Sequence, residues 1–112
     1  MQYYGKKHKS LAKAVFKEDL PQVMSDKKWL LVDIRHPLDF LDGHLEGAIN
    51  ITQQEEFQNL LDSNRDKNIL FNCYSGHTVS LLGNDLVGAG YENVYFLDEE
   101  ITDCLEFLSQ NK

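Results

Sequence analysis

Short apolar runs alternate along the chain with stretches in which apolar residues recur at helical spacing. The apolar runs predict five strands, at Ala14–Phe16, Trp29–Ile34, Ala48–Ile51, Asn68–Cys73 and Asn93–Leu97. The stretches between them predict five helices: Glu18–Lys28, a short helix from Pro37 that ends at Gly43, Glu55–Asp62, His77–Ala89, and a closing helix that carries Ile101, Leu105 and Leu108. The run WLLVDI is apolar almost throughout, which is typical of a strand covered on both faces.

A strand followed by a helix, repeated about five times, is the pattern of an α/β domain. We therefore predict a three-layer sandwich in which about five mostly parallel strands carry helices on both faces. The 112 residues suffice for one such domain, and the sequence contains no linker, internal repeat or low-complexity tract. We assign residues 14–112 to this domain and residues 1–13 to a basic N-terminal extension, which we expect to be frayed.

The charge balance excludes several classes of partner. Acidic residues number 18 and basic residues 11, for a net charge of −7, and five of the lysines lie within the first 17 positions. Such a surface repels phosphate backbones, so we expect no nucleic-acid binding. No apolar run is long enough to span a membrane, and the start lacks the apolar segment of a secretory signal. We expect a cytoplasmic protein that binds no membrane.

The most informative residue is Cys73, because it lies where a predicted strand ends and a predicted helix is about to begin. The segment that starts there is Cys73, Tyr74, Ser75, Gly76, His77 and Thr78. In α/β sheets, ligands bind beyond the carboxyl ends of the strands. A loop of this kind can turn successive backbone N–H groups inward, and the helix adds its partly positive N-terminus. Gly76 permits the positive φ or close backbone approach that this curl needs.

Two interpretations of Cys73 follow from its position. Inward-facing N–H groups favour the charged form of a thiol, so the sulfur is expected to ionise readily and act as a nucleophile. The alternative is a buried cysteine that merely ends a strand, since free cysteines are among the most buried residues. Position alone leaves both interpretations open.

Two stretches of the chain resemble the signatures of the rhodanese-like sulfurtransferase family. The first, Leu30–Ile51, contains Asp33-Ile34-Arg35, a proline with an acidic–aromatic pair, and Gly43-His44-Leu45-x-Gly47-Ala48. The second, Ile69–Ile101, contains the cysteine, Ser75-Gly76, a helix, Gly90-Tyr91 and Asn93-Val94-Tyr95. Together, in order and at the expected spacing, they extend the resemblance over roughly residues 14–108.

This resemblance implies a sulfurtransferase without a metal or cofactor. Cys73 would accept a sulfane sulfur from a small donor or a protein persulfide, hold it as a persulfide, and pass it to a thiol or another nucleophile. The backbone amides of Tyr74, Ser75, Gly76, His77 and Thr78 would cradle the outer sulfur. Asp33 and Arg35 match structural positions near the site, with Arg35 tying the first signature to the active-site region.

The sequence departs from the family pattern in two places. Many active members carry a basic residue, usually arginine, where this chain has Thr78, and the loop contains no lysine or arginine, leaving His77 as its only titratable base. The Gly-Gly that usually follows the last strand is replaced by Asp98-Glu99-Glu100, which is expected to place acidic groups where substrate arrives. Both changes predict weak activity with thiosulfate and favour polysulfide or persulfide donors.

Two other functions are alternatives to sulfur transfer. A related phosphatase family has a loop one residue longer, with histidine before the cysteine and arginine at its end. Here Asn72 precedes Cys73, and no arginine is present to bind a phosphate in the transition state. The more serious alternative is a rhodanese-like module that binds or senses without turnover, which the missing arginine favours and the retained Cys73 opposes.

The remaining polar residues carry weaker hypotheses. Cys104 shares an apolar helical stripe with Leu105 and Leu108, which indicates a buried structural thiol in preference to a resolving cysteine. His77 could pair with the Cys73 thiolate or lie at a solvated loop tip. The run from Asp98 to Glu100 is expected to cap a helix in solvent and not to bind a metal. Oligomeric state and the identities of the donor and acceptor stay open.

Overall fold

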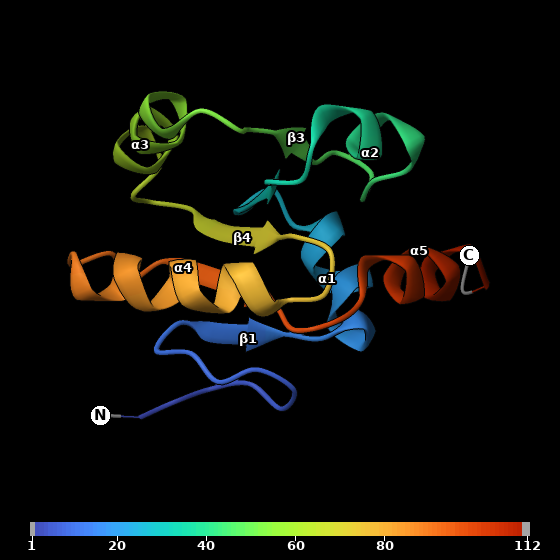
Figure 1. Ribbon diagram of the computed structural model, residues 1–112, viewed down its shortest axis with the longest axis horizontal. Coiled ribbons are helices and arrows are strands. Elements are labelled where there is room, and N and C mark those ends of the chain that lie inside the picture. Colours follow the sequence, from blue (N-terminus) through green and yellow to red (C-terminus); the bar gives the residue numbers. More distant parts are fainter. Residues whose placement is uncertain (1, 111–112) are drawn as a thin grey trace.

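The computed structural model of the protein describes residues 2–110 and confirms the predicted α/β architecture. Its strands are β1 (Lys13–Val15), β2 (Trp29–Asp33), β3 (Ile49–Asn50), β4 (Asn68–Asn72) and β5 (Val94–Leu97). They pair in parallel in the order β1-β5-β4-β2-β3. In Figure 1 the labelled strands β3, β4 and β1 follow one another from top to bottom, in the reverse of this order. The carboxyl ends of all these strands therefore lie at one edge of the sheet, which is where ligands bind in this architecture.

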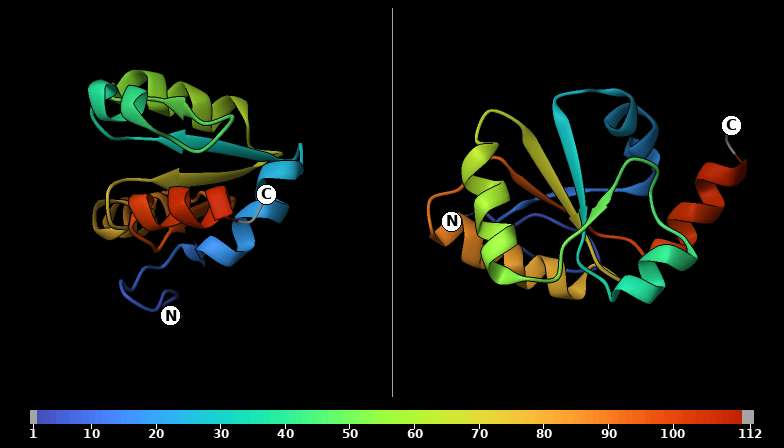
Figure 2. Two further views of the ribbon diagram at one scale, coloured as in Figure 1. Left: turned by 90° about the vertical axis from the view of Figure 1, so that its right-hand side faces the viewer. Right: turned by 90° about the horizontal axis from the view of Figure 1, so that it is seen from above.

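Helices cover both faces of the sheet. They are the 3-10 helix η1 (Lys17–Asp19) and the α-helices α1 (Leu20–Ser25), α2 (Pro37–Asp42), α3 (Gln54–Ser63), α4 (His77–Gly88) and α5 (Ile101–Gln110). The right-hand view of Figure 2 shows α3 and α4 on one side of the strands and α1 and α5 on the other. No helix within residues 2–110 is both long enough and apolar enough to cross a bilayer.

Two hydrophobic cores, one on each face of the sheet, result from the alternation of side chains along the strands. Along β4, Ile69 and Phe71 point into the core beneath α3 and α4, whereas Leu70 points into the core beneath α1 and α5. All three side chains are at most 1% exposed. A strand buried on both faces needs the continuous apolar run that the sequence shows.

The first predicted helix is shorter than expected. The pattern predicts one helix over Glu18–Lys28, but the structure has a 3-10 turn followed by a helix that ends at Ser25. Pro21 has no N–H and is tolerated only in the first helical turn, which sets the start of α1. Asp26 forms the turn that leads into β2, because its carboxylate accepts the Lys28 N–H at 2.9 Å.

The N-terminal segment is packed on the domain, so the prediction of a frayed start was wrong. Tyr4 and Ser10 form an antiparallel bridge, and Ser10 is fully buried, where its hydroxyl donates to the Ser80 carbonyl oxygen at 2.7 Å. The close approach to α4 depends on Gly83, since a Cβ there would lie 2.7 Å from the Ala12 side chain. This segment brings a basic stretch next to the carboxyl edge of the sheet.

Candidate active site

Cys73 lies just beyond the carboxyl end of β4, as the sequence predicts. Its side chain is buried, with 6% of its surface exposed, and belongs to the core beneath α3 and α4. The Gly76 N–H donates to Cys73 Sγ at 3.3 Å, and α4 begins at the next residue. The sulfur therefore faces a backbone donor at the head of a helix of 12 residues, whose first N–H groups have no partner within the helix.

Gly76 has the left-handed backbone that the sequence interpretation requires. Its φ is +99°, and a Cβ on this residue would lie 2.9 Å from the Leu97 carbonyl oxygen and 3.1 Å from Asp98 Cα. Both conditions exclude a side chain here without displacement of the backbone. The active-site loop, residues 73–78, is thus pressed against the connection between β5 and α5.

Tyr74 anchors the active-site loop on two sides. Its carbonyl oxygen accepts the Ile101 N–H at 2.8 Å, and its hydroxyl donates to the Asp39 carboxylate on α2. Hydrogen bonding to Asp39 is the main cause that raises the pKa of the phenol, with burial as a second cause. Tyr74 therefore stays protonated and serves as a hydrogen-bond donor.

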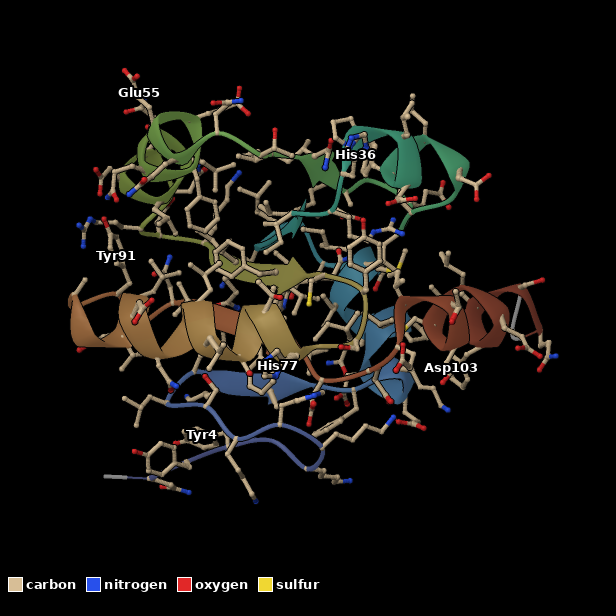
Figure 3. The ribbon with its side chains drawn as sticks, viewed as in Figure 1. Tyr4, His36, Glu55, His77, Tyr91 and Asp103 are labelled. Atoms are coloured by element: carbon tan, nitrogen blue, oxygen red, sulfur yellow. The ribbon has the colours of Figure 1, made fainter. Side chains whose placement is uncertain are left out.

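The other loop side chains leave the sulfur without a neighbouring cation from the loop itself. Ser75 is partly buried, while His77 and Thr78 are exposed on the first turn of α4. Figure 3 shows His77 there, and its ring centroid lies 5.5 Å from that of His8 in the N-terminal segment. The structure thus places the His77 ring at the surface beside a second histidine.

Asp33 and Arg35 form a buried ion pair beside the loop. Arg35 Nε lies 3.0 Å from both carboxylate oxygens of Asp33, and Nη2 lies 2.8 Å from Oδ2. The same Nη2 donates to the Gly43 carbonyl oxygen at 2.6 Å, and the guanidinium lies 5.7 Å from the centroid of the Tyr74 ring. Arg35 therefore joins β2, the end of α2 and the active-site loop.

The acidic residues after β5 bind the N-terminal segment. Asp98 is fully buried, and its carboxylate accepts backbone N–H groups from Lys6, Lys7 and His8 at 2.7, 2.9 and 3.1 Å. The His8 ring nitrogen Nδ1 also lies 3.0 Å from Asp98 Oδ1. Glu99 accepts from Lys7 Nζ at 3.1 Å and from the Lys17 backbone at 3.0 Å. We call this set of contacts the N-terminal brace.

The brace corrects two expectations about the acidic run. Asp98 and Glu99 were expected to cap a helix in solvent and to repel substrate, but they are 0% and 7% exposed. Their charge is compensated by backbone N–H groups and by Lys7, which makes the burial of two carboxylates tolerable. Of the three acidic residues in the run, Glu100 is the exposed one.

The contacts of Asp98 in the brace should make a contribution to the free energy of unfolding that depends on pH. Burial by itself raises the pKa of Asp98, but the hydrogen bonds from residues 6–8 outweigh it and hold that pKa below the ordinary value of 3.8. The folded protein therefore binds fewer protons than the unfolded chain in acid, so the stabilisation is complete above pH 3.8 and is lost as pH falls through the folded pKa.

We expect Asp98→Asn to lower the free energy of unfolding at neutral pH by about 1–3 kcal/mol, because the N–H groups of the brace lose a charged acceptor. The gap between native protein and variant should close as the pH falls through the folded pKa. Urea titrations over this pH range measure both effects, with the exposed Asp42→Asn as control. A gap that stays constant in acid would contradict the assignment.

Cys104 lies on the other side of the sheet from Cys73. Its side chain is fully buried in the core beneath α1 and α5, whereas Cys73 belongs to the core beneath α3 and α4. Burial first, and then the charges of Glu99 and Asp103, raise the pKa of the Cys104 thiol to about 12. This confirms the structural interpretation of Cys104, because a protonated thiol separated from Cys73 by the sheet cannot resolve it.

Asp98 was expected near the site but in solvent, and nothing in the sequence placed His8 beside it. The two residues are 90 positions apart, so no local motif joins them. One signal was present: a cluster of basic residues at the start of the chain is matched by an acidic run after the last strand. Complementary charge at two such positions can indicate contact, but the pattern alone does not show which residues meet.

Comparison with known proteins identifies the family. The sequence model of the rhodanese-like domain matches residues 16–105. The chain is 38% identical over 85 residues to thiosulfate sulfurtransferase GlpE from Haemophilus influenzae, an alignment that covers 71% of this chain and 79% of the relative. The protein therefore belongs to the rhodanese-like domain family.

Solved structures with the same fold carry different descriptions. Reduced CoADR-RHD from Bacillus anthracis superposes with a TM-score of 0.73 at 23% identity, over 88% of this chain and 17% of that longer chain. A Rhodopseudomonas palustris protein of unknown function, described as a possible tyrosine phosphatase, superposes with a TM-score of 0.71 at 18% identity, over 86% and 81% of the two chains. At these identities the likeness concerns the fold alone, so the function must be argued from the site.

Proposed function

We propose that the protein is a sulfurtransferase that carries sulfane sulfur as a persulfide on Cys73 and passes it to a thiol. The observation that carries this proposal is the position of Cys73 Sγ, which receives the Gly76 N–H at 3.3 Å at the head of α4. The Gly76 N–H is placed to donate to the sulfur that attacks the donor and that leaves again when the acceptor takes the sulfane sulfur. Membership of a family whose relatives are named thiosulfate sulfurtransferases supports the same activity.

Each step of the proposed reaction has a group in the active-site loop. The Cys73 thiolate attacks the sulfane sulfur of the donor, a bond forms between Sγ and that sulfur, and the donor leaves with the electron pair of the broken bond. The backbone N–H groups of residues 74–78 are proposed to hold the outer sulfur. Asp33 and Arg35 act as positioning residues, because Arg35 is bound by Asp33 and by the Gly43 carbonyl oxygen and lies against the Tyr74 ring of the loop.

A phosphatase is disfavoured by the same loop. Phosphoryl transfer needs a cationic or bidentate partner for the phosphate oxygens. The loop contains no lysine or arginine, and the neighbouring Arg35 is engaged by Asp33 and Gly43. A module that binds without turnover is favoured by one observation, the 6% exposure of Cys73, and the experiment below separates it from an enzyme.

The test is to incubate the native protein and a Cys73→Ser variant with polysulfide or with thiosulfate and to record intact-mass spectra. We expect the native protein alone to gain one sulfur atom, about 32 Da, and to lose it when a thiol is added. Polysulfide should load the protein better than thiosulfate, because the sulfonate oxygens of thiosulfate call for a cationic or bidentate partner and the loop contains no lysine or arginine. No adduct from either donor on reduced Cys73 would favour the binding module.

A further inference from the structure

A cavity of about 310 Å³ lies between α3 and α4 at the carboxyl edge of the sheet. Its apolar lining comes from Ile34, Ile51, Phe57 and Leu82, and its polar lining from residues 52–54. Small-molecule sites are typically apolar hollows of this size or larger, with a few polar groups that set orientation. A hollow this small holds one ring or a short alkyl chain.

The strand register relates Cys73 to the cavity through Ile34, which is one of the lining residues. Asp33 pairs with Asn72 in the parallel ladder, and the Ile34 N–H donates to the Asn72 carbonyl oxygen at 3.0 Å. Ile34 is therefore the neighbour of Cys73 at the ends of β2 and β4. Because side chains alternate along a strand, Cys73 faces the same side as Phe71, toward α3 and α4. The cavity and Cys73 thus lie on the same face of the sheet, and Ile34, which lines the cavity, is the neighbour of Cys73 in the register.

The chemistry of the cavity selects against charged ligands. All its described lining residues are uncharged, and its polar groups are the hydroxyl of Thr52 and the amides of Gln53 and Gln54. The nearest carboxylate along α3, that of Glu55, points away from the domain in Figure 3. The cavity is open to solvent on one side, and an anionic group that enters it loses part of its hydration without meeting a cation of the lining or of the active-site loop.

We infer that this cavity receives the organic part of a small thiol with an uncharged apolar body, and that this thiol is the acceptor of the sulfur carried by Cys73. The inference rests on the proposed function for the identity of the transferred atom. The acceptor sulfur, as thiolate, attacks the outer sulfur of the Cys73 persulfide and forms a new S–S bond. The bond between the outer sulfur and Sγ breaks, and its electron pair returns to Cys73.

This step is balanced without an additional reagent. The acceptor thiol becomes a persulfide and the Cys73 persulfide becomes a thiol, with the proton of the acceptor passing to the products through solvent. The transferred sulfur keeps its oxidation state, so no oxidant or reductant is needed. Specificity then depends on how well the body of the acceptor fills the cavity while its sulfur reaches the loop.

The kinetic test uses two thiols that share a benzyl body and differ by one carboxylate, phenylmethanethiol and 4-(mercaptomethyl)benzoate. Cys73 is first loaded by polysulfide, and the loading is verified by mass. We expect the rate of sulfur transfer to the neutral thiol to exceed the rate to the carboxylate by about tenfold or more. Gln54→Lys places a cation at the cavity and should narrow this ratio by raising the rate with the carboxylate. Gln22→Lys, an exposed position on α1, is the matched control and should leave the ratio unchanged.

Occupancy of the cavity is measured separately from sulfur transfer. Phenylmethanol cannot accept sulfur, and its titration into unloaded protein should shift the methyl resonances of Ile51 and Leu82 but not those of Leu38, an exposed residue of α2. Thr52→Trp should fill the cavity and abolish these shifts. Equal rates for the two thiols, or methyl resonances that do not move, would overturn the inference. Failure of Cys73 to load would overturn the proposed function instead, and the methyl titration still decides the cavity.

Discussion

Asp33→Ala is expected to lower the free energy of unfolding by about 3–5 kcal/mol, the typical cost of leaving one member of a buried ion pair without its partner. The Arg35 guanidinium is 6% exposed and would lose both carboxylate oxygens at once. Asp33 also accepts the Arg35 backbone N–H at 2.9 Å, so a second donor would be left unpaired. Urea titration of the purified variant measures the loss.

The control for this prediction is the ion pair between Arg65 and Asp62, in which Nη2 and Oδ1 lie 3.3 Å apart. This pair is exposed, with 61% of the Arg65 side chain and 50% of the Asp62 side chain accessible to solvent. Arg65→Ala should cost less than about 1 kcal/mol, because solvent screens such a pair. An Asp33→Leu/Arg35→Met double variant should recover part of the loss, since it removes the charge along with its partner. A cost for Asp33→Ala as small as that for Arg65→Ala would show that Arg35 is held by its other contacts.

Gly76→Ala is expected to lower the rate of sulfur loading on the order of 100-fold, a typical cost of moving a catalytic group by about 1 Å. The added Cβ would need the left-handed backbone at φ +99° and would lie 2.9 Å from the Leu97 carbonyl oxygen. Strain of this kind costs about 1–3 kcal/mol, and relief of the contact moves the loop away from β5. Loading is followed by mass spectrometry after timed exposure to polysulfide.

Gly88→Ala is the matched control for this variant, because Gly76 and Gly88 lie at opposite ends of the same helix, α4. Gly88 is an exposed residue at the end of α4, with no atom within 4 Å of an added Cβ. Alanine there should be neutral or should stabilise the protein by about 0.5–1 kcal/mol, and loading should be unchanged. If Gly76→Ala lowered stability while the loading rate of the folded fraction stayed native, the loop geometry would not govern the chemistry.

The fold could be predicted from the sequence because its main determinants are local. The run from Trp29 to Val32 is apolar because β2 is covered on both faces, and the helices that follow each strand have an apolar stripe. The position of Cys73 follows from the same reasoning, since it directly ends a strand. The left-handed backbone of Gly76 was predictable because a tight loop against a helix start favours glycine.

The brace could not be predicted because its contacts are between distant parts of the chain. Residues 6–8 and Asp98 are separated by about 90 positions, and a basic terminus next to solvent has the same composition as one bound to buried carboxylates. The acidic run after β5 was interpreted by its charge alone, whereas its environment depends on backbone N–H groups that have no signature in sequence. The cavity beside Cys73 was likewise hidden, since it arises from the packing of α3 and α4 against the sheet.

The position of β1 at the edge of the sheet has a consequence for synthesis in the cell. β1 pairs with β5 alone, Lys13 lying beside Tyr95, and the basic segment before it is held by Asp98. A chain leaves the ribosome from its N-terminus, so β1 has no partner in the sheet until β5 emerges. The support of the active-site loop is therefore completed only after β5 and Asp98 have been made, and a nascent chain cannot organise Cys73 for sulfur chemistry before then.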